Sequence, residues 1–232
     1  MANLLIIDTA TESCSVALKY DDQVYTRSEI APRMHGELVL PMVEAVLAEA
    51  GIKLTQLDAI AYGQGPGAFT GIRICISVVQ GLAFGADLPV IGISSLQALA
   101  QGLYQDKKQA RVLAAIDARM GEVYWGQYEV DANGLMKLLD QERVCSPEFV
   151  TISDPDTSIV YSAVGTGWST YAKVLSETLN VPTVIHDKPL YPFAEYMIPM
   201  AEYLYISGES YAAELAVPVY LRDDVAKKAK DL

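Results

Sequence analysis

The chain has 232 residues, of which 51% are hydrophobic and only 20% are charged. This composition supports one large core or two modest ones and excludes a disordered, solvated chain. The chain has 17 Lys and Arg residues and 29 Asp and Glu residues, which gives a formal net charge of −12. So acidic a surface repels phosphate backbones, which argues against a general nucleic-acid binder.

The sequence shows no sign of disulfides, of export or of a membrane span. Cys14, Cys75 and Cys145 are odd in number and lack C-x-x-C spacing, so we expect free thiols. The first residues have no basic region, which argues against a signal peptide. No apolar run approaches the roughly 18 residues that span a bilayer. We therefore expect a cytoplasmic protein that is not embedded in a membrane.

The first hundred residues alternate predicted strands with predicted helices. Short apolar runs are typical of buried strands, and apolar residues at helical spacing predict helices. In chain order we expect strands at 3–7, 15–20 and 23–29, a helix at 37–50, a strand at 59–62, a helix from about 70 to 84, a strand at 89–93 and a helix at 95–103. Such alternation predicts an α/β sheet covered by helices.

The polar segment 105–109 predicts a boundary between two domains, 1–104 and 105–232. After it we expect strands at 112–116, 122–129 and 159–164, a turn at 165–168, and helices at 170–179 and 193–206. Each half opens with a buried strand that ends in an aspartate, Asp8 in the first half and Asp117 in the second. This weak echo predicts two lobes of related topology.

The turn that follows Asp8 has the composition of a phosphate site. Backbone N–H groups and the hydroxyls of Thr9, Thr11 and Ser13 suit anionic oxygens, and Asp8 suits a hydrated Mg²⁺. The alternative is that these residues only satisfy a tight turn. Asp117 favours the nucleotide interpretation, because two-lobed nucleotide clefts use one aspartate-bearing strand end from each lobe.

Two glycine motifs precede predicted helices. Gly165 and Gly167 would let a purine lie against the backbone, or they form a simple turn. The 65–67 segment either presents amides to an anion or only bends the chain into the next helix. Arg73, one turn into that helix, is either a solvated charge or the partner of an acidic group.

No pattern predicts a catalytic centre or a metal site. The only two histidines, His35 and His186, lie 151 positions apart and have no companion ligand motif. Nothing in the spacing pairs either of them with a cysteine nucleophile. We therefore predict no catalytic residue and no metal ligand.

Four segments together resemble the bacterial TsaB (YeaZ) family: DTATESCSVAL at 8–18, GPGAFTGIR at 65–73, DARMGEVY at 117–124 and PVYLR at 218–222. The resemblance covers essentially the whole chain. It implies an actin-like, sugar-kinase-like (ribonuclease H-like) fold with a reduced second lobe. It also implies a role in forming N6-threonylcarbamoyladenosine in tRNA, on the adenosine 3′ of the anticodon.

The same resemblance implies a subunit without activity of its own. Members of this family act with the paralogous enzyme TsaD, and the ATPase TsaE joins the complex. TsaD-type proteins hold a metal through a His-x-x-x-His motif, whereas residues 94–100 here read SSLQALA. Asp8, Thr9 and Thr11 are then remnants of a phosphate loop, and ATP or ADP with Mg²⁺ is expected at an interface with TsaD; whether this subunit itself binds a nucleotide is left open. The alternatives are a stand-alone ATPase or kinase of this fold and a metallopeptidase-like protein acting on its partner.

We expect the helices at 37–50 and 70–84 to form the TsaD-binding surface, although both helices must also cover their own sheet. Without TsaD, a homodimer through an overlapping surface is expected. Contact with tRNA is expected to be indirect, with Lys227, Lys228 and Lys230 forming a solvated basic tail. The residues predicted to contact the partner are Val39, Val43, Ile72, Cys75, Val79 and Leu82.

Overall fold

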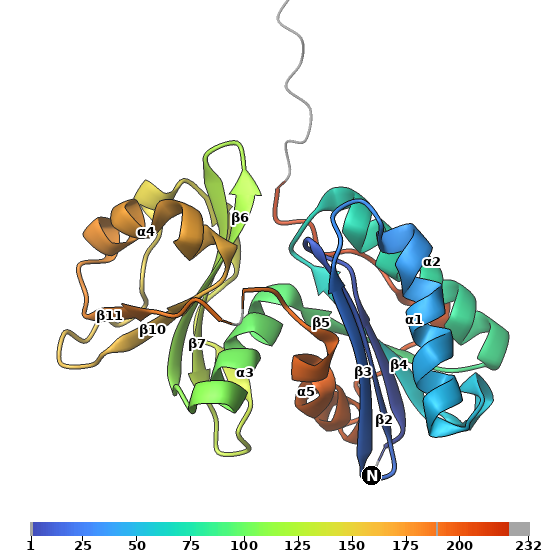
Figure 1. Cartoon of the computed structure of the whole chain (residues 1–232). Helices are drawn as coiled ribbons and strands as arrows, with labels where there is room; N and C mark the ends of the chain where they lie inside the picture. Colours follow the sequence, from blue (N-terminus) through green and yellow to red (C-terminus); the bar gives the residue numbers. More distant parts are fainter. Residues whose placement is uncertain (1, 189, 223–232) are drawn as a thin grey trace, which may run out of the picture.

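The computed structural model describes residues 2–188 and 190–222, which form two α/β lobes side by side (Figure 1). Lobe 1 is built on a five-stranded sheet in the order β3-β2-β1-β4-β5. Its strands are β1 (Leu4–Asp8), β2 (Ser13–Tyr20), β3 (Gln23–Ile30), β4 (Ala59–Gly65) and β5 (Val90–Ser94). Strand β1 pairs antiparallel with β2 and parallel with β4, so it lies at the centre of the sheet.

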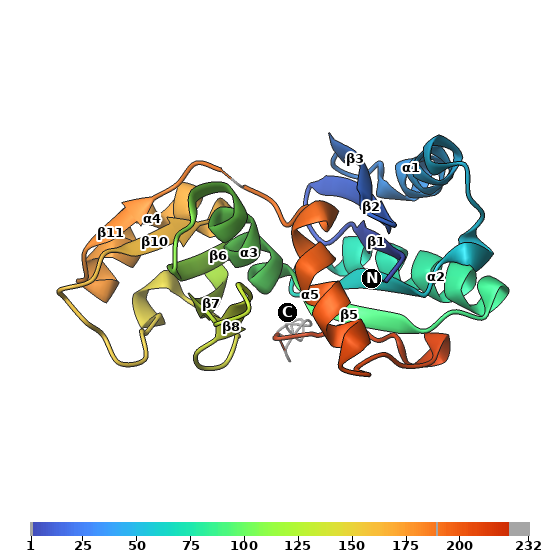
Figure 2. The ribbon, with the colours of Figure 1, turned by 90° about the horizontal axis from the view of Figure 1, so that it is seen from below.

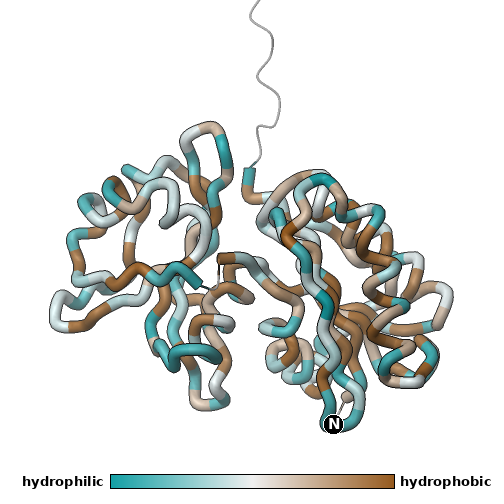
Figure 3. The backbone as a smooth tube through the Cα atoms, in the orientation of Figure 1, coloured by the Kyte–Doolittle hydropathy of each residue, from teal (hydrophilic) through white to brown (hydrophobic). Residues whose placement is uncertain are grey.

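Helices cover both faces of this sheet. On one face lie α1 (His35–Ala50) and α2 (Phe69–Ala86), and on the other lies α5 (Ala194–Ile206). Alternate residues of β1 serve the two cores, with Leu5 facing α1 and α2 and Leu4 facing α5. Strand β1 is fully buried for this reason, whereas the edge strand β3 is mostly exposed. Figure 3 shows that β3 is also more hydrophilic than the strands inside the sheet.

Lobe 2 is built on a sheet in the order β11-β10-β6-β7-β8, with β9 also paired to β7. Its strands are β6 (Arg111–Arg119), β7 (Glu122–Val130), β8 (Met136–Leu138), β9 (Arg143–Cys145), β10 (Tyr161–Val164) and β11 (Thr183–Ile185). Helix α3 (Ser95–Lys107) covers one face and α4 (Thr166–Leu179) covers the other. Three short 3₁₀ helices span Leu54–Gln56, Pro147–Phe149 and Ala213–Leu215.

The chain passes between the lobes more than once. Most of helix α3 precedes residue 105, yet the helix packs on the sheet of lobe 2, and α5 follows residue 105 but packs on the sheet of lobe 1. The two helices also contact each other between the sheets, as Figures 1 and 2 show. A single cut after residue 104 therefore does not separate the elements of the two cores.

Most predicted elements are confirmed to within a few residues, as is usual for element ends. Helix α1 ends where Gly51 adopts a left-handed φ of 70°. Two expectations differ. The polar segment expected to separate the domains is mostly the last turn of α3, and the turn expected at 165–168 is the first turn of α4.

Candidate functional site

A cavity of about 270 Å³ lies between the lobes, where β1 and β6 end. Thr11 and Glu12 line it from the β1–β2 turn, and Asp117 and Arg119 line it from lobe 2. Phe69 at the start of α2 and Tyr220 near the C-terminus complete the wall. Cavities for small ligands usually measure roughly 300–1,000 Å³, so this one is small for a nucleotide.

Asp8 does not line this cavity. Its side chain is fully buried, with Oδ1 accepting the Ala10 N–H at 3.2 Å and Oδ2 without a partner among the described residues. Burial raises the pKa of this carboxyl from 3.8 to about 7. Gly63 covers Oδ2 so closely that a Cβ at that position would lie 1.8 Å away. Asp8 is therefore sealed from the cleft.

The glycine-rich segment closes the predicted phosphate loop. Thr9 Oγ1 donates to the Gly71 carbonyl at 2.7 Å, and the Ala68 N–H donates to the Ala10 carbonyl at 2.7 Å. A Cβ at Gly67 or Gly71 would lie 2.2 or 2.1 Å from a carbonyl oxygen of this turn. These glycines bring the start of α2 directly against the turn. In this conformation they serve close packing.

Replacing Gly71 by alanine is expected to lower the free energy of unfolding by about 1–3 kcal/mol, the usual cost of overpacking. The new Cβ would lie 2.1 Å from the Thr9 carbonyl oxygen, and a backbone atom has little freedom to move. The matched change Gly81→Ala, in the same helix, meets nothing within 4 Å. It should raise the free energy of unfolding by up to about 1 kcal/mol, since alanine favours the helix. Urea denaturation measures both, and equal effects would contradict this packing.

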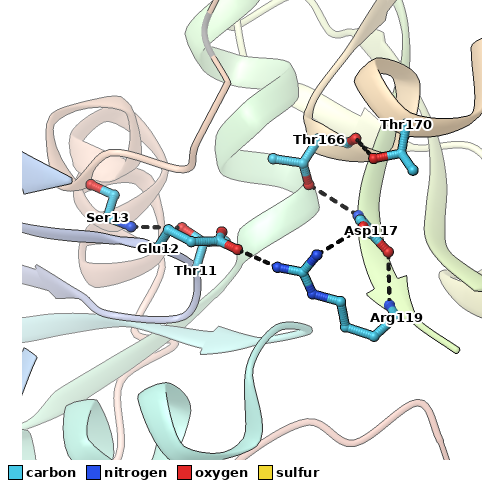
Figure 4. Close-up of polar contacts among 7 residues, drawn as sticks. All are labelled: Thr11, Glu12, Ser13, Asp117, Arg119, Thr166 and Thr170. Atoms are coloured by element: carbon cyan, nitrogen blue, oxygen red, sulfur yellow. Dashed lines mark hydrogen bonds and ion pairs between the residues drawn. The ribbon is translucent and has the colours of Figure 1, made fainter. Parts of the chain in front are cut away.

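Across the cleft, Arg119 joins the two lobes (Figure 4). Its Nη2 lies 2.7 Å from Glu12 Oε1, and its Nη1 lies 3.1 Å from Asp117 Oδ2. The Asp117 Oδ1 atom accepts the Arg119 N–H at 2.8 Å, and the Asp117 N–H donates to Thr166 Oγ1 at 3.0 Å. Both oxygens of Asp117 are thus already bound. Thr11 Oγ1 accepts the Ser13 N–H at 3.4 Å, as expected for a tight turn.

Gly165 and Gly167 pack against β6 and do not line the cavity. At Gly165, where φ is +103°, a Cβ would lie 2.3 Å from the Ala115 carbonyl oxygen. At Gly167 it would lie 2.8 Å from the Ala115 Cβ. Both glycines let α4 begin directly on the strand, which is a packing role.

Residues 217–222, which we call the strap, run from lobe 1 to lobe 2 along the cleft. The Val219 N–H donates to the Gln64 carbonyl at 2.9 Å. The ring of Tyr220 stacks on Phe69 at 5.5 Å, and its hydroxyl accepts a hydrogen bond from Arg73 Nε at 2.9 Å. At the far end, Arg222 donates to the Ala118 carbonyl at 3.1 Å and pairs with Glu122.

The sequence motif at 218–222 marked the strap without assigning it a role. The sequence left Arg73 as either a solvated charge or the partner of an acidic group. In the structure its hydrogen-bond partner is the hydroxyl of Tyr220. Glu12, Arg119 and Arg222 were missed altogether as cleft residues. The tail lysines 227, 228 and 230 lie outside the described residues.

This cleft does not fit a magnesium nucleotide in the conformation described. Asp8 is sealed, while Glu12 and Asp117 already pair with Arg119. Within residues 2–188 and 190–222, no three His, Cys, Asp or Glu side chains gather where a metal ion could be held. A nucleotide at an interface with TsaD stays a prediction.

The residues predicted to contact a partner lie on the buried sides of α1 and α2, so that prediction is wrong about the side. Five of the six predicted residues are at most 3% exposed and pack in the core of lobe 1. The reason is that each helix must bury its apolar stripe against its own sheet. Only Leu82 is partly exposed. The buried five are Val39, Val43, Ile72, Cys75 and Val79.

The outward side of α2 carries apolar residues beside three exposed polar ones, Thr70, Arg73 and Ser77. Within the described residues, α2 alone is long and apolar enough to cross a membrane by length and composition, yet only 33% of it is buried. Ile74, Val78 and Leu82 are partly exposed, and Phe84 is 83% exposed. Gly81 has open space around it. Exposed apolar surface of this kind is typical of interaction sites.

Comparison with known proteins identifies relatives of this chain. Residues 25–230 match the family model of TsaD, tRNA N6-adenosine threonylcarbamoyltransferase. The chain is 47% identical to the tRNA threonylcarbamoyladenosine biosynthesis protein TsaB of Escherichia coli K12, over 97% of this chain and 96% of that protein. The corresponding Haemophilus influenzae protein is 40% identical over 97% of this chain and 95% of its own length.

A solved structure, YeaZ from Pseudomonas aeruginosa, is 45% identical with a TM-score of 0.87. The match covers 95% of this chain and 100% of that one. Together with the two sheets and their helices, these matches confirm the two-lobed, actin-like α/β fold.

Proposed function

We propose that this chain, which belongs to the TsaB (YeaZ) family, is a non-catalytic partner subunit of a TsaD-type enzyme in tRNA N6-threonylcarbamoyladenosine biosynthesis. It works in the cytoplasm, where a TsaE-type ATPase joins the complex. The names of its relatives support the pathway. The outward side of α2 is the single observation that supports the partner role.

The proposed contact surface consists of Phe69, Ile74, Val78, Gly81 and Phe84 on α2, which we call the α2 face. Apolar side chains flank a position without a side chain, so a helix of another protein can approach the α2 backbone closely. Burying an exposed aromatic residue such as Phe84 is a common source of binding energy in interfaces. Residues buried beneath the α2 face fix its shape and do not touch the partner.

In the absence of a TsaD-type enzyme, the α2 face pairs with a second copy of the chain. A surface suited to a homologue of the same fold suits a two-fold contact between identical chains. The two assemblies then exclude each other. Contact with tRNA is left to the partner, because a chain of net charge −12 is a poor platform for RNA.

The other two functions find less support in the site. A stand-alone ATPase or kinase needs an accessible carboxylate for Mg²⁺, and Asp8 is sealed beneath Gly63. A metallopeptidase needs a set of metal ligands, and the described residues gather none.

Reconstitution of tRNA modification tests the proposed function. The mixture holds unmodified tRNA, a TsaD-type enzyme, a TsaE-type ATPase, and an enzyme that makes threonylcarbamoyl-adenylate from threonine, bicarbonate and ATP. Omitting this chain is expected to reduce the modified nucleoside, measured by mass spectrometry of digested tRNA, to background. An unchanged yield without the chain would overturn the proposal.

A further inference from the structure

We propose that the strap locks the cleft closed by joining the start of α2 in lobe 1 to the β6–β7 turn in lobe 2. This lock is a property of the isolated chain and goes beyond the partner role. The strap ends on one lobe in a stack of aromatic rings and on the other in a charged side chain. A relative movement of the lobes must break one of these ends.

The end on lobe 1 is the stronger of the two. Tyr220 stacks on Phe69, and Arg73 both donates to the Tyr220 hydroxyl and lies with Cζ 3.7 Å from the centre of the Phe69 ring. Val219 adds a backbone hydrogen bond to Gln64. Stacking, a cation over an aromatic ring and a backbone bond act together here, so this end stays on lobe 1 when the lobes part.

The end on lobe 2 holds a turn of unusual backbone conformation. Arg119, Met120 and Gly121 have successive φ values of 61°, 59° and 80°. Residues other than glycine rarely adopt this region, so the surroundings must hold the turn in place. Arg222 does so by binding the Ala118 carbonyl and Glu122, one residue on either side of these three.

The ion pair between Glu12 and Arg119 crosses the same cleft but contributes less. The Arg119 side chain is 71% exposed and that of Glu12 is 33% exposed. Exposed pairs of this kind are screened by water and salt. Of these two contacts across the cleft, the strap is therefore the stronger, and the ion pair orients the turn that Arg222 binds.

A distance measurement between the lobes tests the lock. Asp22→Cys in the β2–β3 turn and Lys173→Cys on α4 place nitroxide labels on exposed sites of the two lobes, with Cys145 replaced by serine. Pulsed electron paramagnetic resonance then gives the distribution of distances between the two nitroxide labels. The lock variant is Tyr220→Ala/Arg222→Ala, and the matched control is Arg111→Ala, whose ion pair with Glu129 lies within lobe 2.

We expect one narrow distribution for the labelled parent and for the control, and a broader, longer one for the lock variant. An unchanged distribution in the lock variant overturns the proposal, as does an equal change in the control.

A charge-reversal pair keeps the test decisive if the lock variant does not fold. Arg222→Glu places two carboxylates, its own and that of Glu122, at the end of the strap on lobe 2 and should broaden the distribution. Glu122→Arg added to Arg222→Glu should narrow it again. Broadening that the second change does not reverse would show that the turn, and not the contact between lobes, had been disturbed, which counts against the proposal.

Discussion

Replacing Gly81 by arginine is expected to abolish binding of a TsaD-type partner while leaving the isolated chain folded. Gly81 lies on the α2 face with nothing within 4 Å of where a Cβ would sit. A long side chain there occupies the space that a partner helix needs. We expect binding to weaken more than about 100-fold, which corresponds to about 2.7 kcal/mol. Isothermal titration with the partner measures the loss.

The isolated variant should be no less stable than the parent, because glycine is a poor helix former and arginine is a good one. Ser169→Arg on α4 is the matched control, since it adds the same charge to an exposed helix of the other lobe. It should bind the partner normally. The homodimer, followed by light scattering, should disappear with Gly81→Arg as well. Normal binding by Gly81→Arg would place the partner elsewhere on the molecule.

Replacing Asp8 by asparagine is expected to change how the stability of the chain depends on pH. Burial raises the pKa of Asp8 from 3.8 to about 7, so the folded state holds this proton more tightly than the unfolded state. The resulting stabilisation is complete below about pH 4 and is lost as the pH rises to about 7. Three pKa units correspond to about 4 kcal/mol, an upper bound for the effect.

Asparagine cannot ionise, and its oxygen still accepts the Ala10 N–H. The free energy of unfolding of Asp8→Asn, relative to the parent, should therefore rise steadily between pH 4 and pH 7 and then level off. Thr9→Val is the control: it removes the buried hydrogen bond to Gly71 but no titrating group, so its effect should not vary with pH. Urea denaturation at a series of pH values measures both. Parallel curves for Asp8→Asn and the parent would show that the pKa of Asp8 is the same in the folded and unfolded states, so that burial does not raise it.

Local patterns predicted most of the elements because burial is periodic. The continuous apolar run at β1 reflects a strand covered on both faces, and Gly51 ends α1 because it accepts a left-handed conformation. Patterns could not distinguish the two sides of α2. The stripe of Ile72, Cys75 and Val79 covers the sheet, and the outward side also carries large apolar residues such as Phe84, so spacing alone does not separate the two sides.

The site depends on distant residues, which limits prediction from sequence. Asp117 lines the cleft because strand ends collect at one edge of a sheet, and its role toward a nucleotide stays a prediction. Asp8 has the same local pattern but is sealed by Gly63, a contact that only tertiary packing creates. The bridge between Glu12 and Arg119 spans 107 positions and depends on the angle between the lobes. Local sequence patterns do not determine the angle between the two lobes.

The placement of α5 on lobe 1 has a consequence for how the chain is made. Leu4 and Ile6 leave the ribosome long before the side chains that cover them, such as Met197 and Ala201, which come almost two hundred residues later in the chain. At roughly 5–20 residues per second, about 10 to 40 seconds separate the two. During that time one face of the nascent sheet has no cover. Lobe 1 therefore completes its core only after lobe 2 has been synthesised, and chaperones have a defined interval in which to bind it.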